Sequence, residues 1–225
     1  MALALSGGKD SMACLFLMRE QLTCAIYVDT GFAYPETRKI INYAASLLPV
    51  HVVPSDRAVQ NAKHGIPADV VPIDWTALGH AITGPKPIMI QSYLQCCWEN
   101  ISAPVYAKAK ELGVTHLVNG QRRDERAKST AQDGTVVDGI TRVHPIEDWT
   151  ADEVLNYLAL HMDVPPHFAF THSSLDCYDC PAYARDSQDR IAWTQTTYPD
   201  AYTQYAGRRD AITAALAASL EGCAV

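Results

Sequence analysis

The chain has 225 residues, of which 48% are hydrophobic, and a formal net charge of −7 at pH 7. This length and apolar content suit one substantial hydrophobic core with a small annex, and they exclude a mostly disordered chain. No apolar run reaches the roughly 18 residues of a membrane span, and no leader precedes the first expected strand, so we expect a cytoplasmic protein without a membrane partner. The negative net charge does not attract nucleic acid to the molecule as a whole, so such a partner would need a local basic patch.

Short apolar runs alternate with helical periodicity along much of the chain. We expect strands at residues 2–5, 24–28, 51–53 and 115–118, and helices at 11–20, 35–48 and 105–112. This order is typical of α/β proteins with a doubly wound, mainly parallel sheet. Ligands of such sheets bind beyond the carboxyl ends of the strands, which is where Ser6, Asp29 and Gly120 fall.

The remaining segments are less regular. Residues 54–95 contain five prolines and three glycines with little periodicity, which predicts an inserted, partly irregular lid or annex. Asp-Gly pairs at 133–134 and 138–139 predict a short β-ribbon, and TADE at 150–153 is a capping box that opens a helix to about residue 161. The end of the chain reads as helical with a break at 198–199. We therefore expect one domain over residues 1–181 and a helical C-terminal extension over 182–225.

The string SGGKDS at residues 6–11 lies between the first expected strand and the first expected helix. Such a turn directs several backbone N–H groups at one spot, at the positive end of a helix dipole, and so forms an anion cradle. Glycines allow a phosphate to approach closely, Ser6 and Ser11 add hydroxyl donors, and Lys9 adds charge. The loop is shorter than a Walker A loop. For the Gly-Gly pair alone, an ordinary tight turn is the alternative.

The full string resembles the PP-loop of the N-type ATP pyrophosphatases, in the adenine nucleotide alpha hydrolase-like superfamily. Three further segments resemble the phosphoadenosine phosphosulfate and adenylyl-sulfate reductases within it: VDTG at 28–31 with YPET at 34–37, GQRRD at 120–124, and HPIEDWT at 144–150. Taken singly, Asp29 would be a turn or capping residue and the two arginines a solvated pair. The resemblance implies an adenylyl nucleotide substrate and the nucleotide-binding residues Ser6, Gly7, Gly8, Lys9, Asp10, Ser11, Asp29, Thr30, Gly31, Gly120 and Arg122.

Four of the seven cysteines fall into two pairs. Cys96 and Cys97 are adjacent, and Cys177 and Cys180 form a C-x-x-C about eighty positions later. Four thiolates are the usual ligands of a [4Fe–4S] cluster or of a structural zinc. Taken singly, the first pair could be core residues, and the second a redox dithiol or half a zinc site. The resemblance favours the cluster over zinc, because cluster-carrying adenylyl-sulfate reductases show similar spacing.

The resemblance also implies a reaction. A phosphosulfate on the loop would be neutralised by Lys9, Arg122 and Arg123 and attacked by a C-terminal cysteine, here Cys223. The chain ends in EGCAV at 221–225, where the family has Glu-Cys-Gly-[Leu/Ile]-His, and Trp98-Glu99 replaces a basic Arg-Lys pair. A thioredoxin-like reductant is the expected electron donor, and a homo-oligomer the expected assembly.

Two other functions remain open. In an ATP-using enzyme of sulfur transfer or nucleic-acid modification, the loop would hold Mg-ATP, a substrate oxygen would be adenylated, and AMP and pyrophosphate would be released. A nucleotide-sensing subunit for a partner enzyme would use the same loop without catalysis. Formation of sulfite from adenylyl sulfate distinguishes the reductase from the ATP-using enzyme.

Overall fold

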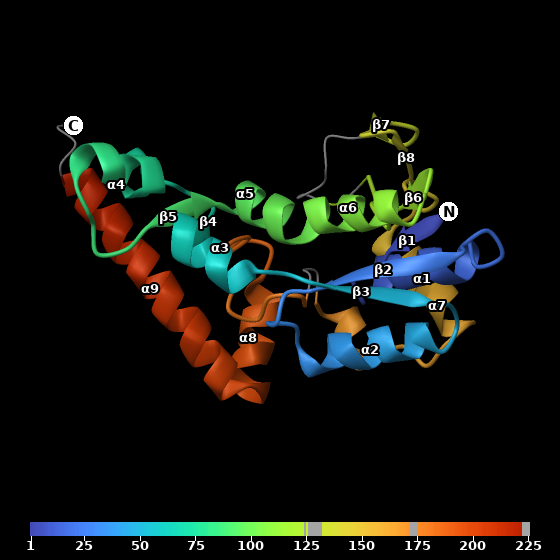
Figure 1. Ribbon diagram of the computed structural model, residues 1–225. Coiled ribbons are helices and arrows are strands. Elements are labelled where there is room, and N and C mark those ends of the chain that lie inside the picture. The colour runs from blue at the N-terminus through green and yellow to red at the C-terminus, as the bar shows by residue number, and fades with distance from the viewer. Residues whose placement is uncertain (124, 126–131, 172–174, 222–225) are drawn as a thin grey trace.

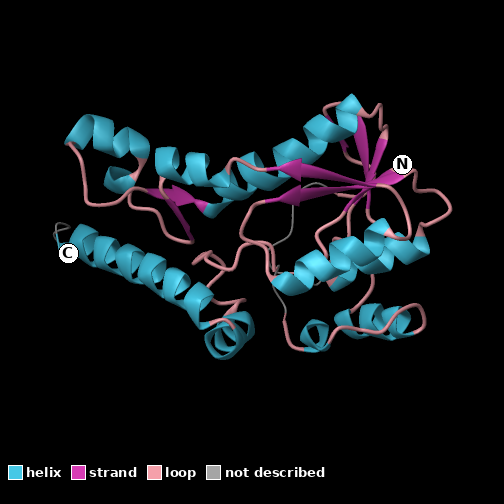
Figure 2. Ribbon diagram, turned by 60° about the horizontal axis from the view of Figure 1, so that its bottom comes forward, coloured by secondary structure: helices cyan, strands magenta, loops and turns pink. Residues whose placement is uncertain are grey.

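The computed structural model describes residues 1–123, 125, 132–171 and 175–221. Its main sheet has six strands in the order β3-β2-β1-β6-β8-β7 (Figures 1 and 2). All neighbours pair in parallel except β7 and β8, which are antiparallel. The strands are β1 (Ala2–Ala4), β2 (Cys24–Asp29), β3 (Val50–Pro54), β6 (His116–Val118), β7 (Val136–Val137) and β8 (Ile140–Val143). The predicted doubly wound, mainly parallel sheet is thus confirmed, and so is the predicted ribbon.

Helices cover both faces of this sheet, as Figure 1 shows for α6 (Ala103–Glu111) on one side and α2 (Pro35–Ala45) on the other. Successive residues of a strand point to opposite faces. Leu3 and Tyr27 accordingly belong to a core formed with α1 (Lys9–Leu17), α2 and α7 (Ala151–Ala159), whereas Ile26 belongs to a second core formed with α6. The central strands are therefore buried on both faces, which is why they read as continuous apolar runs.

The order of the strands reverses at β1, which lies between β2 and β6. The chain moves outward from β1 to β3 on one side and continues through β6 on the other. Loops that leave the carboxyl ends of β1 and β6 therefore diverge and leave a crevice, the usual ligand site of such sheets. The SGGKDS loop follows β1, and Gly120 follows β6.

The segment 54–95 is more regular than the sequence predicts. It contains α3 (Arg57–His64), α4 (Ala77–Thr83), a short 3-10 turn (Ile73–Trp75), and the strands β4 (Ile66–Ala68) and β5 (Ile90–Ser92), which pair in parallel. With α9 (Pro199–Glu221) these elements form a lobe at the end of the molecule opposite the N-terminus (Figure 1). Its small core includes Trp75, Ile90 and Ile212. We call this lobe the annex.

Helix α5 (Tyr93–Cys97) runs through a π-helical segment (Trp98–Ser102) into α6, so this helix begins well before the predicted start. The capping box at Thr150 and Glu153 is confirmed, and it opens α7. The C-terminal region contains α8 (Gln188–Thr197) and α9, separated at Tyr198 as predicted. No helix within the described ranges is long and apolar enough to cross a membrane.

Candidate nucleotide site and cysteine site

The SGGKDS loop turns sharply from β1 into α1. Gly7 has a φ of +76°, a conformation that favours glycine, and a Cβ added there would lie in tight contact, 3.0 Å from Thr37 Cγ2. The Ser6 hydroxyl accepts a hydrogen bond from the Gly8 N–H at 3.3 Å, and the Ser11 hydroxyl donates to the Gly8 carbonyl at 2.9 Å. Gly8 precedes the helix without a side-chain cap. The first turn of α1 thus presents backbone N–H groups to an incoming anion.

Two cations at the loop share one carboxylate. Lys9 Nζ lies 2.9 Å from Asp10 Oδ2, and Arg122 Nε lies 2.7 Å from Asp10 Oδ1. Lys9 and Arg122 are both buried. Asp10 therefore connects the loop after β1 to the loop after β6 and holds both positive charges beside the crevice.

Gly120 fits directly against the start of α1. A Cβ at this position would lie 2.6 Å from the carbonyl carbon of Asp10 and 2.7 Å from the nitrogen of Ser11. Real side chains do not approach a backbone so closely, so only glycine lets β6 and α1 meet here.

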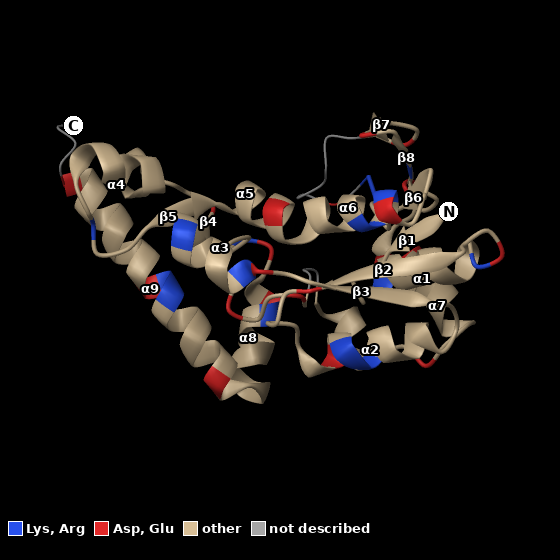
Figure 3. Ribbon diagram, in the orientation of Figure 1, with Lys and Arg blue, Asp and Glu red and all other residues tan. Residues whose placement is uncertain are grey.

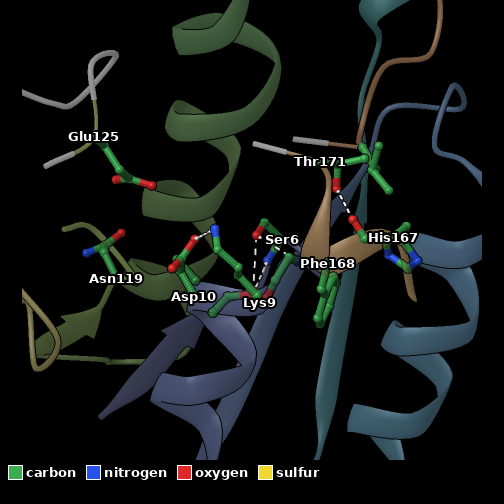
Figure 4. A pocket seen from close by; sticks show the side chains of 14 residues that line it. Ser6, Lys9, Asp10, Asn119, Glu125, His167, Phe168 and Thr171 are labelled. Carbon is green, nitrogen blue, oxygen red and sulfur yellow. Dashed lines mark hydrogen bonds and ion pairs between the residues drawn. The ribbon is translucent and has the colours of Figure 1, made fainter. Parts of the chain in front are cut away.

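A cavity of about 300 Å³ opens over this loop (Figure 4). Among the predicted nucleotide-binding residues, Ser6 to Ser11 and Gly120 line it. Sequence reasoning did not assign the other polar and aromatic residues of the lining, which are Asn119, Glu125, His167, Phe168 and Thr171. Asn119 could have been found from its place after β6, but no local pattern marks His167 or Phe168, which come from a distant segment.

Glu125 brings a carboxylate into the cavity wall. It is partly buried, and its Oε2 accepts a hydrogen bond from the Arg122 N–H at 3.2 Å. Burial raises the pKa of Glu125 above its usual value, and the negative charge of Asp10 adds to this shift. The cavity therefore combines cationic and acidic groups.

Asp29, Thr30, Gly31 and Arg123 are not among the residues that line the cavity. Asp29 Oδ1 accepts a hydrogen bond from the Gly31 N–H at 2.9 Å, and Thr30 Oγ1 donates to the Asp176 carbonyl at 2.7 Å. The turn after β2 thus contacts the segment that carries Cys177. Arg123 is exposed and lies 2.7 Å from Asp148, away from the cavity lining. Cys223 lies outside the described residues.

The two cysteine pairs come from α5 and from the loop before α8. Cys96 Sγ lies 3.5 Å from Asn61 Oδ1, Cys97 Sγ lies 3.7 Å from the Tyr183 hydroxyl, and Cys177 Sγ lies 3.6 Å from Thr30 Oγ1. Within the described residues, no group of three or more His, Cys, Asp or Glu side chains is arranged to hold a metal ion.

Electrostatic interactions connect the four thiols, which we call the cysteine site. Burial is the largest cause of a raised pKa at each of them, and it raises the pKa of Cys97 to about 12. A charge on Cys180 raises the pKa of Cys96, Cys97 and Cys177 further. The positive charge of Arg57 lowers the pKa of Cys96, Cys177 and Cys180, against the effect of burial.

Three buried or largely buried arginines surround this site. Arg57 is 1% exposed, and its Nη2 lies 2.8 Å from Asp179 Oδ1. Arg208 Nη1 lies 2.9 Å from Asp179 Oδ2, and Arg190 donates to the carbonyls of Cys180 and Cys177. Among the described residues, several of their buried nitrogens have no hydrogen-bond partner: Arg57 Nη1, Arg190 Nε, and Arg208 Nε and Nη2.

Comparison with known structures agrees with this architecture. Phosphoadenylyl-sulfate reductase from Candida auris, in a phosphate complex, is 17% identical, with a TM-score of 0.50 over 77% of this chain and 79% of that one. FMN adenylyltransferase from Candida glabrata is 11% identical, with a TM-score of 0.42 over 79% of this chain and 50% of that one. At 17% identity the likeness to the reductase concerns the fold alone, and the TM-score of the adenylyltransferase is too low to support a shared fold. No curated protein matches the sequence.

A family model provides the stronger result. The model described as the phosphoadenosine phosphosulfate reductase domain matches residues 1–183, which include the loop, the crevice and all four cysteines of the cysteine site. The resemblance inferred from the sequence motifs is thereby confirmed. This chain belongs to the phosphoadenosine phosphosulfate reductase domain family.

Proposed function

We propose that this protein is an iron–sulfur enzyme that binds adenylyl sulfate, or its 3′-phosphorylated form, in the cavity and reduces the sulfate to sulfite. The observation that carries the proposal is that the cavity and the cysteine site are formed in part by the same segment of the chain. Leu175 lines the cavity, and the chain continues from it directly into Cys177 and Cys180. A nucleotide in the cavity would therefore lie beside the cysteine site.

The donor types of the cysteine site and its unpaired arginine nitrogens support a [4Fe–4S] cluster, although the described side chains are not arranged to hold a single metal ion. Such a cluster is usually held by four cysteine sulfur atoms, without nitrogen or oxygen ligands, and the cysteine site offers four cysteines. The buried arginine nitrogens without partners call for a nearby anion, because an unsatisfied buried donor is costly. A cluster held by four thiolates is such an anion, and its sulfur atoms accept N–H hydrogen bonds. Zinc would also bind four thiolates and is the alternative that metal analysis must exclude.

The loop and its cations fit the anionic part of the nucleotide. The N-terminus of α1, the Ser6 hydroxyl and Lys9 can neutralise a phosphosulfate, and Arg122 can do so from the opposite loop. In the reaction, two electrons from a thioredoxin-like dithiol reduce the sulfur, the bond between sulfur and the bridging oxygen breaks, and the nucleotide leaves, as AMP from adenylyl sulfate or as adenosine 3′,5′-bisphosphate from the 3′-phosphorylated form. The dithiol becomes a disulfide, and sulfite is released. Such a reaction needs a reducing compartment, so we propose a cytoplasmic enzyme.

Glu125 favours a second candidate, an ATP pyrophosphatase-type adenylating enzyme. A carboxylate beside an anion site repels a sulfate, but it suits a nucleotide that arrives with a divalent cation such as Mg²⁺. Sulfur transfer or nucleic-acid modification would follow from this activity. In Figure 3, however, Lys and Arg are interspersed with Asp and Glu over the described chain, with no long basic stretch of the kind that binds nucleic acid.

The test begins with protein purified without oxygen. We expect about four irons and a matching amount of sulfide per chain, and we expect Cys180→Ser to lose most of the iron. Cys24→Ala is the matched control, because Cys24 lies in the core of the sheet and should leave iron content unchanged.

The same preparation is then given each nucleotide. Adenylyl sulfate or its 3′-phosphorylated form with a dithiol should yield sulfite and the free nucleotide in equal amounts. Protein that contains zinc in place of iron would contradict the proposed cluster. If the protein converts ATP to AMP and pyrophosphate but forms no sulfite from either sulfonucleotide, the second candidate function replaces the reductase.

A further inference from the structure

The C-terminal helices α8 and α9 lie beyond residue 183, where the family match ends, yet they contact the cysteine site. We infer that this helical extension completes that site: Arg190 and Arg208 are positioning residues that hold the Cys177–Cys180 loop and supply positive charge to the metal–thiolate group. The inference rests on the proposed cluster, but it concerns residues that the family match does not include.

Arg190 fixes the backbone of the loop. It lies on α8 and is 3% exposed. Its Nη2 donates to the Cys180 carbonyl at 3.2 Å and its Nη1 to the Cys177 carbonyl at 3.5 Å. One guanidinium group therefore contacts both ends of the C-x-x-C segment, so the spacing of the two thiols depends on where α8 packs.

Asp179, between the two cysteines, joins α3 to α9. It is 2% exposed, with Arg57 of α3 on one carboxylate oxygen and Arg208 of α9 on the other. The Arg57 guanidinium also lies over the Phe32 ring, 4.3 Å from its centroid. Helices from two distant parts of the chain thus meet at the one acidic side chain of the C-x-x-C loop.

The charge balance of this arrangement indicates an anionic occupant. Three guanidinium groups surround the thiols, and Asp179 is the carboxylate that pairs with two of them, those of Arg57 and Arg208. Buried positive charge without compensation is costly. After pairing with Asp179, Arg208 keeps two buried nitrogens that have no partner in the part of the chain that the structure describes. A metal–thiolate anion at the cysteine site would supply the missing charge and accept these hydrogen bonds.

Arg208→Gln tests the inference, with Arg209→Gln as the control. Arg209 is the next residue of α9, but its side chain is 46% exposed and contacts Asp210 and the Tyr205 ring of its own helix, not Asp179. Full-length protein of each variant is purified without oxygen and exposed to an iron chelator. We expect Arg208→Gln to lose iron about 10-fold faster than wild type, the usual size of outer-shell effects on metal sites, and Arg209→Gln to match wild type.

Redox titration followed by absorbance gives a second readout. Loss of a cation and of N–H donors should lower the reduction potential of the metal centre in Arg208→Gln, because the more negative reduced state loses stabilisation. Arg208→Lys retains a positive charge that can pair with Asp179. This variant therefore allows the test to be made even if Arg208→Gln does not fold. We expect it to fold and to show an intermediate rate of iron loss.

The outcomes separate this inference from the proposed function. Wild-type protein without iron would contradict the proposed cluster itself. Wild-type protein with iron, and Arg208 variants that match Arg209→Gln in both iron loss and potential, would overturn the role of the extension while leaving the cluster in place.

Discussion

Gly120→Ala is expected to weaken nucleotide binding by about 10- to 100-fold. The added Cβ would lie 2.6 Å from the carbonyl carbon of Asp10, so the first turn of α1 must move away from β6. Overpacking of this kind costs about 1–3 kcal/mol, and each 1.4 kcal/mol corresponds to a factor of ten in affinity. The shift would displace both the N–H groups of the loop and Asp10, which holds Lys9 and Arg122. Isothermal titration with AMP and adenylyl sulfate measures the loss.

Gly207→Ala is the matched control. Gly207 lies inside α9, and apart from the backbone of its own helix a Cβ there meets no atom of the described residues within 4 Å. Alanine is a better helix former than glycine, so this variant should be more stable by about 0.5–1 kcal/mol, with unchanged affinity. Equal affinity in the two variants would show that the contact between Gly120 and α1 does not shape the site. Thermal denaturation of both variants separates a local shift from unfolding.

Asp179→Asn is expected to destabilise the protein by about 3–5 kcal/mol, the usual cost of removing one partner of a buried ion pair. The asparagine keeps the shape of the side chain but leaves Arg57 and Arg208 without their common carboxylate. Helices α3 and α9 would then lose their connection to the cysteine loop. Urea denaturation of wild type and variant, followed by circular dichroism, gives the free energy of unfolding.

Asp210→Asn provides the comparison on the same helix. Its partner Arg209 is exposed, and exposed ion pairs contribute about 0–1 kcal/mol. We expect a change at the lower end of that range. If Asp179→Asn were no more destabilising than Asp210→Asn, the buried pairs around Asp179 would not hold the annex to the rest of the fold.

The annex shows why part of the fold could not be predicted. Helix α3 has the sequence RAVQNAKH, and the residue it buries is Arg57, not an apolar side chain. A periodicity of hydrophobic residues cannot reveal a helix whose buried contact is ionic. Arg57 can be buried because Asp179 lies beside it, and Asp179 comes from the far end of the chain. Helices α3 and α4 are also short and lie close to prolines, so the sequence carries little other local evidence that this segment is helical.

The sequence by itself determined the parallel sheet, the phosphate-type loop after β1, the capping box of α7 and the family. These features depend on local patterns: buried strands, glycines at a strand-to-helix turn, and residues three positions apart. Only the tertiary structure decided which side chains complete the two sites. Arg122 meets Asp10 across 112 positions, and Thr30 meets the Asp176 carbonyl across 146. Such contacts arise when distant segments pack at one edge of the sheet, so no local pattern encodes Glu125 and Phe168 in the cavity, or the arginines around the cysteines.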